Sequence, residues 1–256
     1  MKSIKTVSRY DWLQISSDPK SLLHELESES VYIVKNYLTG QMCDLIRSEC
    51  RYFADQTGAT WFPLLKSCPD YYRIHNKYPN AHVQTVQNGW YFHTWNDKFA
   101  WFFAIPGIAE LFQLKQRIGE LADSSFLSNE ADSGPVARIV VHRYPRGGGG
   151  QDEHIDPVSN FARCQTVIQL STPGVDYESG GFFVRDSTGA VSYLDKLTGK
   201  GDLLVISPGL SHGVEPIDPD ENLDWNSSDG RWIILPVILL SDHFSDSAER
   251  PRKAIF

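Results

Sequence analysis

The chain of 256 residues lacks the features that mark several large classes of protein. Lysine and arginine number 24 against 32 acidic residues, for a formal charge of -8, which disfavours a nucleic-acid substrate because backbone-binding proteins usually carry a basic stripe. No window approaches eighteen unbroken apolar residues, and the first residues lack the apolar segment of a secretory signal. We therefore expect a cytoplasmic protein without nucleic-acid or membrane partners, and a homo-oligomer is compatible with the sequence.

Cysteine is also scarce, and its spacing carries no signature. The four cysteines include no C-x-x-C pair, so neither a zinc ribbon nor a disulfide framework is expected, and reduced thiols are predicted. Internal repeats and low-complexity tracts are absent, and 41% of the residues are hydrophobic. A chain of this length and composition can bury one large core unaided, so a single domain spanning 1–256 is predicted.

The first half of the chain indicates helices and an unusual density of aromatic side chains. A β-branched run at 31–34 precedes a segment in which Cys43, Ile46, Cys50 and Phe53 recur at helical spacing, and 108–122 predicts a second helix that ends near Asp123. Aromatic residues crowd 61–103. That segment is expected to be core or an oligomer contact, or to line or cover a substrate pocket.

The second half indicates a sheet. Six strand-like runs punctuated by turn residues occupy 136–144, 163–171, 180–186, 190–195, 201–207 and 231–240. They predict an antiparallel sandwich or small barrel, and helices followed by strands indicate an α+β fold. We divide the chain into a helical, aromatic-rich support with a candidate lid (1–135), a barrel core (136–240) and a C-terminal tail (241–256). The four glycines at 147–150 are expected to form a flexible connection.

Three residues in the barrel region have the chemistry of a metal site. His154 and Asp156 are two positions apart, so an extended backbone would point both side chains to one face. His212 follows Asp156 by 56 residues, enough for several strands to return it to the same place. Two imidazoles and one carboxylate bind Fe(II) on one face and leave coordination positions open. Arg231 begins the last apolar strand and needs a carboxylate partner if buried; none stands beside it in this run, which favours a ligand carboxylate.

The ordered motifs H-x-D, G-G-x-F, G-D-L-L-V-x-S-P, H-x-V-x-P and G-R-W resemble the double-stranded β-helix core of the Fe(II)- and 2-oxoglutarate-dependent dioxygenases, in the prolyl-hydroxylase-like branch. The resemblance covers 136–240 and implies a jelly-roll or cupin-like barrel braced by N-terminal helices. It implies that His154, Asp156 and His212 are the iron ligands, and that Arg231 and Tyr144 bind 2-oxoglutarate. Arg231 lies 19 residues after His212 (231 - 212), more than is usual in that family, and a longer hairpin accounts for this.

Several further residues are weaker candidates for the site. Gln169 is a candidate for binding 2-oxoglutarate. Arg138 and His142 share a strand face with Tyr144 and are candidates for substrate contact, as is Asp152; the alternatives are a hydrogen-bonded core histidine for His142 and a solvated carboxylate for Asp152. The remaining histidines show no ligand spacing and are expected to be structural or at the surface: His24, His75, His82, His93 and His243.

The resemblance implies an enzyme that uses Fe(II), 2-oxoglutarate and O2 to hydroxylate an unactivated C–H bond, with release of succinate and CO2. Related halogenases have a small residue at the position of Asp156, so its carboxylate favours hydroxylation or desaturation. A small metabolite, such as a free amino acid or biosynthetic intermediate, is the expected substrate. Two alternatives stay open: hydroxylation of a protein or peptide side chain, and a non-catalytic cupin-like protein that binds metal or a small acid.

Overall fold

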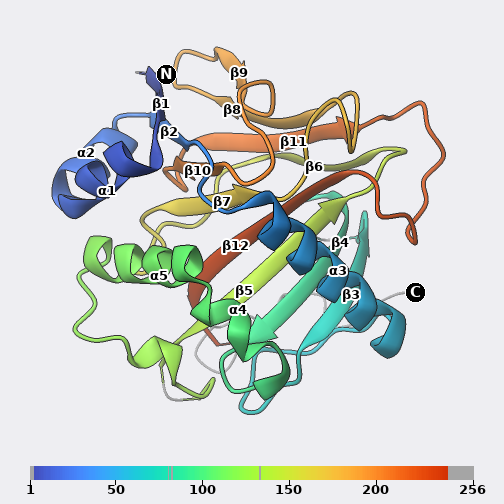
Figure 1. Cartoon of the computed structure of the whole chain (residues 1–256), viewed down its shortest axis with the longest axis horizontal. Helices are drawn as coiled ribbons and strands as arrows, with labels where there is room; N and C mark the ends of the chain where they lie inside the picture. The colour runs from blue at the N-terminus through green and yellow to red at the C-terminus, as the bar shows by residue number, and fades with distance from the viewer. Residues whose placement is uncertain (1–2, 80, 82, 133, 242–256) are drawn as a thin grey trace.

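The computed structural model describes residues 3–79, 81, 83–132 and 134–241. Its fold is α+β (Figure 1). The helices are α1 (Arg9–Ser17), α2 (Pro19–Glu27), α3 (Gly40–Thr57), α4 (Ala100–Ala104) and α5 (Pro106–Ile118), with short 3-10 turns at Asp97–Phe99 and Ser125–Leu127. The strands before the barrel core are β1 (Ser3–Val7), β2 (Ser30–Val34), β3 (Tyr71–Asn76) and β4 (Thr85–His93). The core contains β5 (Pro135–Tyr144), β6 (Gly149–His154), β7 (Gln165–Gln169), β8 (Gly181–Arg185), β9 (Val191–Tyr193), β10 (Leu203–Ile206), β11 (Ser211–Ile217) and β12 (Arg231–Leu240).

Hydrogen bonding arranges these strands as two layers of a barrel. One layer runs β1-β2-β10-β7-β12-β5-β4, with β3 paired to β4, and the other runs β6-β11-β8-β9. The β4–β6 pairing joins the layers at one edge, and the second layer lies across the top of Figure 1. Apart from the short β9, the strands from β5 to β12 alternate between the layers, which is the double-stranded β-helix expected from the motifs.

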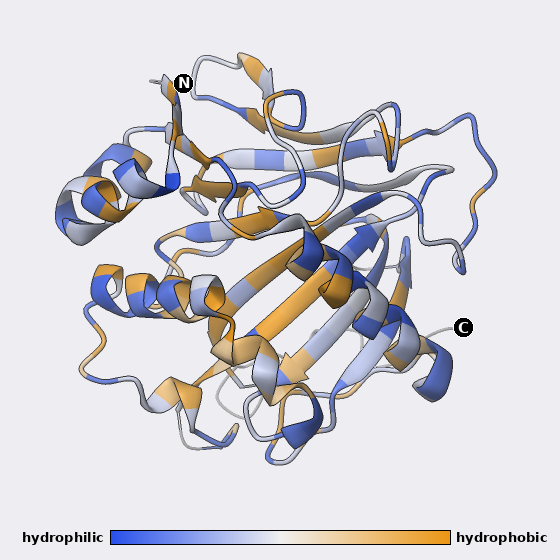
Figure 2. Ribbon diagram, viewed as in Figure 1, coloured by the Kyte–Doolittle hydropathy of each residue, from blue (hydrophilic) through white to orange (hydrophobic). Residues whose placement is uncertain are grey.

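Side-chain alternation in β5 separates a helix-facing core from the barrel interior. Ala137, Ile139 and Val141 are fully buried and belong to the apolar core that includes α3, α4 and α5. The even-numbered residues of β5 point the other way, between the two layers, as expected for successive residues of a strand. The apolar stripes of α3 and α5 lie over the same sheet face (Figure 2). The helices therefore pack against the outer face of one layer and do not occupy the space between the two layers.

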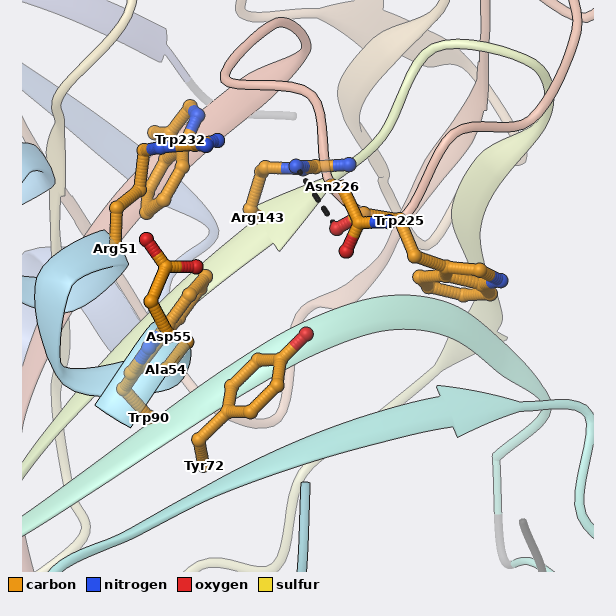
Figure 3. Close-up of a pocket in the computed structure, with 9 residues that line it drawn as sticks. All are labelled: Arg51, Ala54, Asp55, Tyr72, Trp90, Arg143, Trp225, Asn226 and Trp232. Atoms are coloured by element: carbon orange, nitrogen blue, oxygen red, sulfur yellow. Dashed lines mark hydrogen bonds between the residues drawn. The ribbon is translucent and has the colours of Figure 1, made fainter. Parts of the chain in front are cut away.

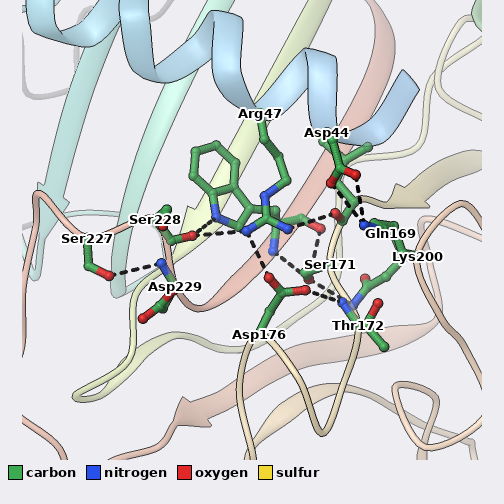
Figure 4. Close-up of polar contacts among 12 residues, drawn as sticks. Asp44, Arg47, Gln169, Ser171, Thr172, Asp176, Lys200, Ser227, Ser228 and Asp229 are labelled. Atoms are coloured by element: carbon green, nitrogen blue, oxygen red, sulfur yellow. Dashed lines mark hydrogen bonds and ion pairs between the residues drawn. The ribbon is translucent and has the colours of Figure 1, made fainter. Parts of the chain in front are cut away.

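The β11–β12 connection, 218–230, is fastened to the outside of the barrel. Arg143, buried on the helix-facing side of β5, donates through Nη1 to the carbonyl oxygen of Trp225 at 3.4 Å (Figure 3). It also donates through Nη2 to the carbonyl oxygen of Asp224. Arg47 of α3 pairs with Asp176 at 2.9 Å and donates to the carbonyl oxygen of Ser228 at 3.2 Å (Figure 4). The additional residues between His212 and Arg231 therefore form a connection that packs beside α3.

The structure differs from several expectations. Helix α5 ends at Ile118 because Gly119 caps it, earlier than the predicted end near Asp123. The glycine run is only partly a connection, since Gly149 and Gly150 belong to β6. Most of the aromatic residues between 61 and 103 lie in β3, β4 and α4. Trp90, Phe92, Phe99 and Phe102 belong to the core, which agrees with the core interpretation of this segment, while Tyr91 lines a cavity.

Other expectations are confirmed or fall outside the described residues. The four cysteines are buried and form no disulfide, as predicted from their spacing. In the part of the chain that the structure describes, no helix has the length and apolarity needed to cross a membrane. The predicted C-terminal tail lies outside the described residues beyond Ser241, as do His82 and His243.

Candidate active site

The three predicted ligands meet at the ends of paired strands. The β6–β11 ladder places His154 directly opposite His212, with ring centroids 4.4 Å apart. The Nε2 atom of His154 lies 3.4 Å from one carboxylate oxygen of Asp156, and that of His212 lies 3.6 Å from the other. One donor atom from each residue lies within 4.8 Å of the others. The sequence separation of 56 residues is thus closed by the barrel, as predicted.

Both imidazoles are held with the same nitrogen turned toward the third ligand. Nδ1 of His154 lies 2.8 Å from the carbonyl oxygen of Asp152, and Nδ1 of His212 lies 2.8 Å from that of Leu210. A carbonyl oxygen only accepts, so each Nδ1 must carry a proton, and in the neutral form of each ring Nε2 then offers its lone pair to a metal. In metal-binding histidines, a hydrogen bond from the ring nitrogen that does not bind the metal fixes the orientation of the ring.

The third predicted ligand, Asp156, is positioned by its own backbone, and its carboxyl group favours the ionised form. The amide of Asp156 donates to the carbonyl oxygen of Pro208 at 2.9 Å, which ties the loop after β6 to the loop before β11. Burial opposes ionisation of Asp156, but its interactions with His154 and His212 outweigh burial and hold the pKa of the carboxyl well below its ordinary value. A carboxylate with two neutral imidazoles is the donor set that suits Fe(II).

Arg231 has a partner that the sequence did not indicate. Its Nε and Nη2 atoms donate to the two carboxylate oxygens of Asp195 at 2.7 and 3.1 Å, and both side chains are buried. The absence of an acidic residue from its own run therefore does not leave Arg231 without a protein partner, because the turn after β9 supplies a carboxylate from 36 residues away. Nη1 of Arg231 is nevertheless buried without a hydrogen-bond partner. The side-on pair leaves the end of the guanidinium available to a second carboxylate.

The two other predicted co-substrate residues lie near this pair. Tyr144 pairs with Arg231 across the β5–β12 ladder, its ring lies 5.7 Å from the guanidinium carbon, and its hydroxyl donates to Gln151 at 3.0 Å. The amide nitrogen of Gln169 donates to the hydroxyl of Tyr177 at 3.1 Å, which in turn donates to Asp195. The side-chain oxygen of Gln169 is buried and has no hydrogen-bond partner. It can accept a hydrogen bond from a ligand, but Gln169 adds no positive charge that could pair with a carboxylate.

The candidate substrate residues divide into two groups. Arg138 and His142 line a cavity of about 380 Å³ that also touches Asp156, which we call the β5–β12 cavity. Burial lowers the pKa of His142 to about 4, with the charge of Arg231 adding to the effect, so its ring is neutral near pH 7. Asp152 is exposed and contributes only its carbonyl oxygen to His154; it does not line this cavity.

The sequence did not identify two residues of the site region, Asp195 and His93. Asp195 follows a three-residue strand and resembles any turn carboxylate. His93 ends β4, and its Nε2 atom accepts from Nε of Arg138 at 3.1 Å. The alternation of Tyr91 and His93 on one strand was the available clue, and it was obscured by the surrounding aromatic residues.

Comparison with known proteins supports the fold on structure alone. Neither a protein-family model nor a curated protein matches the sequence. A prolyl-4-hydroxylase from Pseudomonas putida is similar with a TM-score of 0.52 and 14% identity, over 87% of this chain and 98% of that one. A full-length protein from Neurospora crassa, solved in complex with alpha-KG and thymine, is similar with a TM-score of 0.56 and 12% identity, over 94% of this chain and 87% of that one.

The chain shares the fold of these two proteins. The resemblance inferred from the ordered motifs is thereby confirmed at the level of architecture. The identities of 14% and 12% leave the chemistry to be argued from the residues of this chain. Those residues fit the expected groups: three convergent donors suit a ferrous ion, and a buried guanidinium nitrogen without a partner suits the distal carboxylate of an oxo-acid.

Proposed function

We propose that the protein is an Fe(II)- and 2-oxoglutarate-dependent dioxygenase that hydroxylates an unactivated C–H bond of a small molecule. The observation that carries the proposal is the convergence of His154, Asp156 and His212, with the Nε2 atom of each imidazole turned toward the carboxylate of Asp156. In the overall reaction one oxygen atom of O2 enters the substrate as hydroxyl. The other enters 2-oxoglutarate as that acid loses CO2 and becomes succinate.

Each residue contributes binding or orientation. When bound, the metal and the keto acid supply the oxidising chemistry, and the protein supplies position and a dry environment. His154, Asp156 and His212 would hold the metal. Arg231 would hold the distal carboxylate of 2-oxoglutarate through Nη1, with Asp195 fixing the plane of the guanidinium and Tyr144 packed beside it.

A small molecule is the preferred substrate because a pocket of small-molecule volume lies beside Asp156. The β5–β12 cavity measures about 380 Å³, within the lower range of small-molecule pockets. The retained Asp156 carboxylate favours hydroxylation over halogenation, because it occupies the position that a halide would need. A protein side chain is the second candidate substrate, and it is separated by the experiment below.

Anaerobic titration with Fe(II) and 2-oxoglutarate tests the proposal. The protein should develop a visible metal-to-ligand charge-transfer band, which Asp156→Ala abolishes and which Arg231→Met shifts to much higher 2-oxoglutarate concentrations. No band at saturation would favour a cupin-like binding protein without oxygenase chemistry. Succinate release with small acids, amino acids and peptides would then identify the substrate, and turnover with peptides alone would overturn the small-molecule preference.

A further inference from the structure

The β5–β12 cavity has a charge imbalance that bears on what it binds. Its lining includes residues of two paired strands, with Val140 opposite Leu235 and Arg138 opposite Val237. Most of the surface is apolar, but two buried cationic residues, Arg138 and Lys115, also line it. The one acidic lining residue is Asp156, which the proposed function assigns to the metal. The cavity therefore presents positive charge to its contents.

Arg138 is held in a fixed orientation from one side. Its Nε atom donates to Nε2 of His93 at 3.1 Å, and Nδ1 of His93 lies 3.2 Å from a carboxylate oxygen of Asp70. Because Asp70 accepts from Nδ1, His93 is protonated there and accepts at Nε2. Burial lowers the pKa of His93 to about 4, so it remains a neutral acceptor near pH 7. The Asp70–His93 pair thus binds the Nε side of the Arg138 guanidinium, its inner edge, and thereby positions the two terminal nitrogen atoms, its outer edge.

The outer edge of Arg138 is left for a ligand. Arg138 is 9% exposed, and among residues 3–79, 81, 83–132 and 134–241 no carboxylate lies within ion-pair distance of it. Tyr91 lies beside the guanidinium, 5.4 Å from ring centroid to guanidinium carbon. A buried guanidinium without a counterion carries a large desolvation cost. The other lining cation, Lys115, already donates to the carbonyl oxygen of Cys164 at 2.7 Å.

Distance along the strand sets the shape of the ligand. His142, beside the metal end of the cavity, is four residues from Arg138 on β5, about 13 Å along an extended strand. The apolar side chains of Val140 and Leu235 lie between these positions. A ligand that spans the cavity therefore places an anionic group at one end, an apolar segment in the middle and its reacting carbon at the other end.

We propose that the substrate is an apolar monocarboxylic acid whose carboxylate pairs with Arg138 and whose carbon chain lies along β5 and β12 toward Asp156. This assignment rests on the proposed function, since it takes the Asp156 end as the place of reaction. It also distinguishes among small molecules. A free amino acid would bring an ammonium group, and the one lining carboxylate, Asp156, is already assigned to the metal.

Binding of simple acids tests the assignment without requiring turnover. Calorimetric titration of the full chain with hexanoate, octanoate and decanoate should show binding of at least one, while octanamide and octylamine bind much more weakly. Arg138→Gln should weaken the best acid roughly ten- to hundredfold, as expected for the loss of a charged hydrogen-bonded pair. Arg163→Gln removes a partly exposed arginine paired with Glu27 and is the matched control, expected to leave acid binding unchanged.

The outcomes separate this inference from the proposed function. Equal binding of octanoate and octanamide, unchanged acid binding by Arg138→Gln, or no binding of any acid would overturn the carboxylate assignment even where the charge-transfer band is present. Acid binding without the charge-transfer band would support the carboxylate-binding site at Arg138 but would contradict the proposed oxygenase function. If Arg138→Gln does not fold, Arg138→Lys and the acid-against-amide comparison on the unaltered chain still decide.

Discussion

The buried pair of Arg231 and Asp195 gives the most quantitative prediction. The two side chains are 0% and 4% exposed and share two hydrogen bonds. Asp195→Asn keeps the volume but removes the charge, so the guanidinium stays buried without its counterion. Breaking a buried pair in this way costs about 3–5 kcal/mol. At roughly 2–4 °C per kcal/mol for a chain of this size, we expect the melting temperature to fall by about 6–20 °C.

Differential scanning calorimetry of the metal-free protein, with two companion variants, tests this reasoning. Arg231→Met with Asp195→Leu replaces both charges by apolar groups and should recover most of the lost stability, although it would not bind 2-oxoglutarate. Glu27→Gln breaks an exposed pair with Arg163 and should cost at most about 1 kcal/mol. The argument is refuted if Asp195→Asn melts like Glu27→Gln, or if the double variant is no more stable than Asp195→Asn.

Two further predictions follow from the same region and from β4. Gly181 has φ +118, and an added Cβ would lie 2.4 Å from a carboxylate oxygen of Asp195; Gly181→Ala should therefore lower the melting temperature in the direction of Asp195→Asn, and an unchanged melting temperature would contradict that close approach. Burial lowers the pKa of His93 from 6.5 to about 4, so between these values the unfolded chain binds a proton that the folded chain does not. Stability should fall as pH drops from 6.5 to 4, by at most roughly 3 kcal/mol from this residue. Urea unfolding of the metal-free protein at pH 7 and pH 4.5 measures the fall, which should be smaller in His93→Gln; equal falls would refute the argument.

The sequence could predict those parts of the molecule whose signals are local or ordered. Helix α3 followed from its 3.6-residue apolar period, and β12 followed from an unbroken apolar run. His154, Asp156 and His212 were recognised because their order along the chain, together with the strands between them, implied a returning barrel. The structure brings these three side chains together as that order required.

Parts that depend on distant pairing could not be predicted. The partner of Arg231 comes from a turn 36 residues away, and no rule of spacing distinguishes Asp195 from other turn carboxylates. Strands β3 and β4 were hidden because aromatic side chains occupy both of their faces, which removes the alternation that marks a half-buried strand. Strand β6 was obscured by its two glycines, whose tolerance of close backbone contact is a tertiary property.

The pairing of β6 with β11 ties metal affinity to correct assembly of the barrel. His154 and His212 are direct partners in that ladder, and irregularities in register occur immediately beyond them, between His212 and Val214. A slip of one residue in either strand would turn one imidazole to the opposite face. Bound ferrous ion would then select the native strand alignment over its neighbouring alternatives, because misaligned molecules would lose a coordinating nitrogen as the last strands of the chain close the structure.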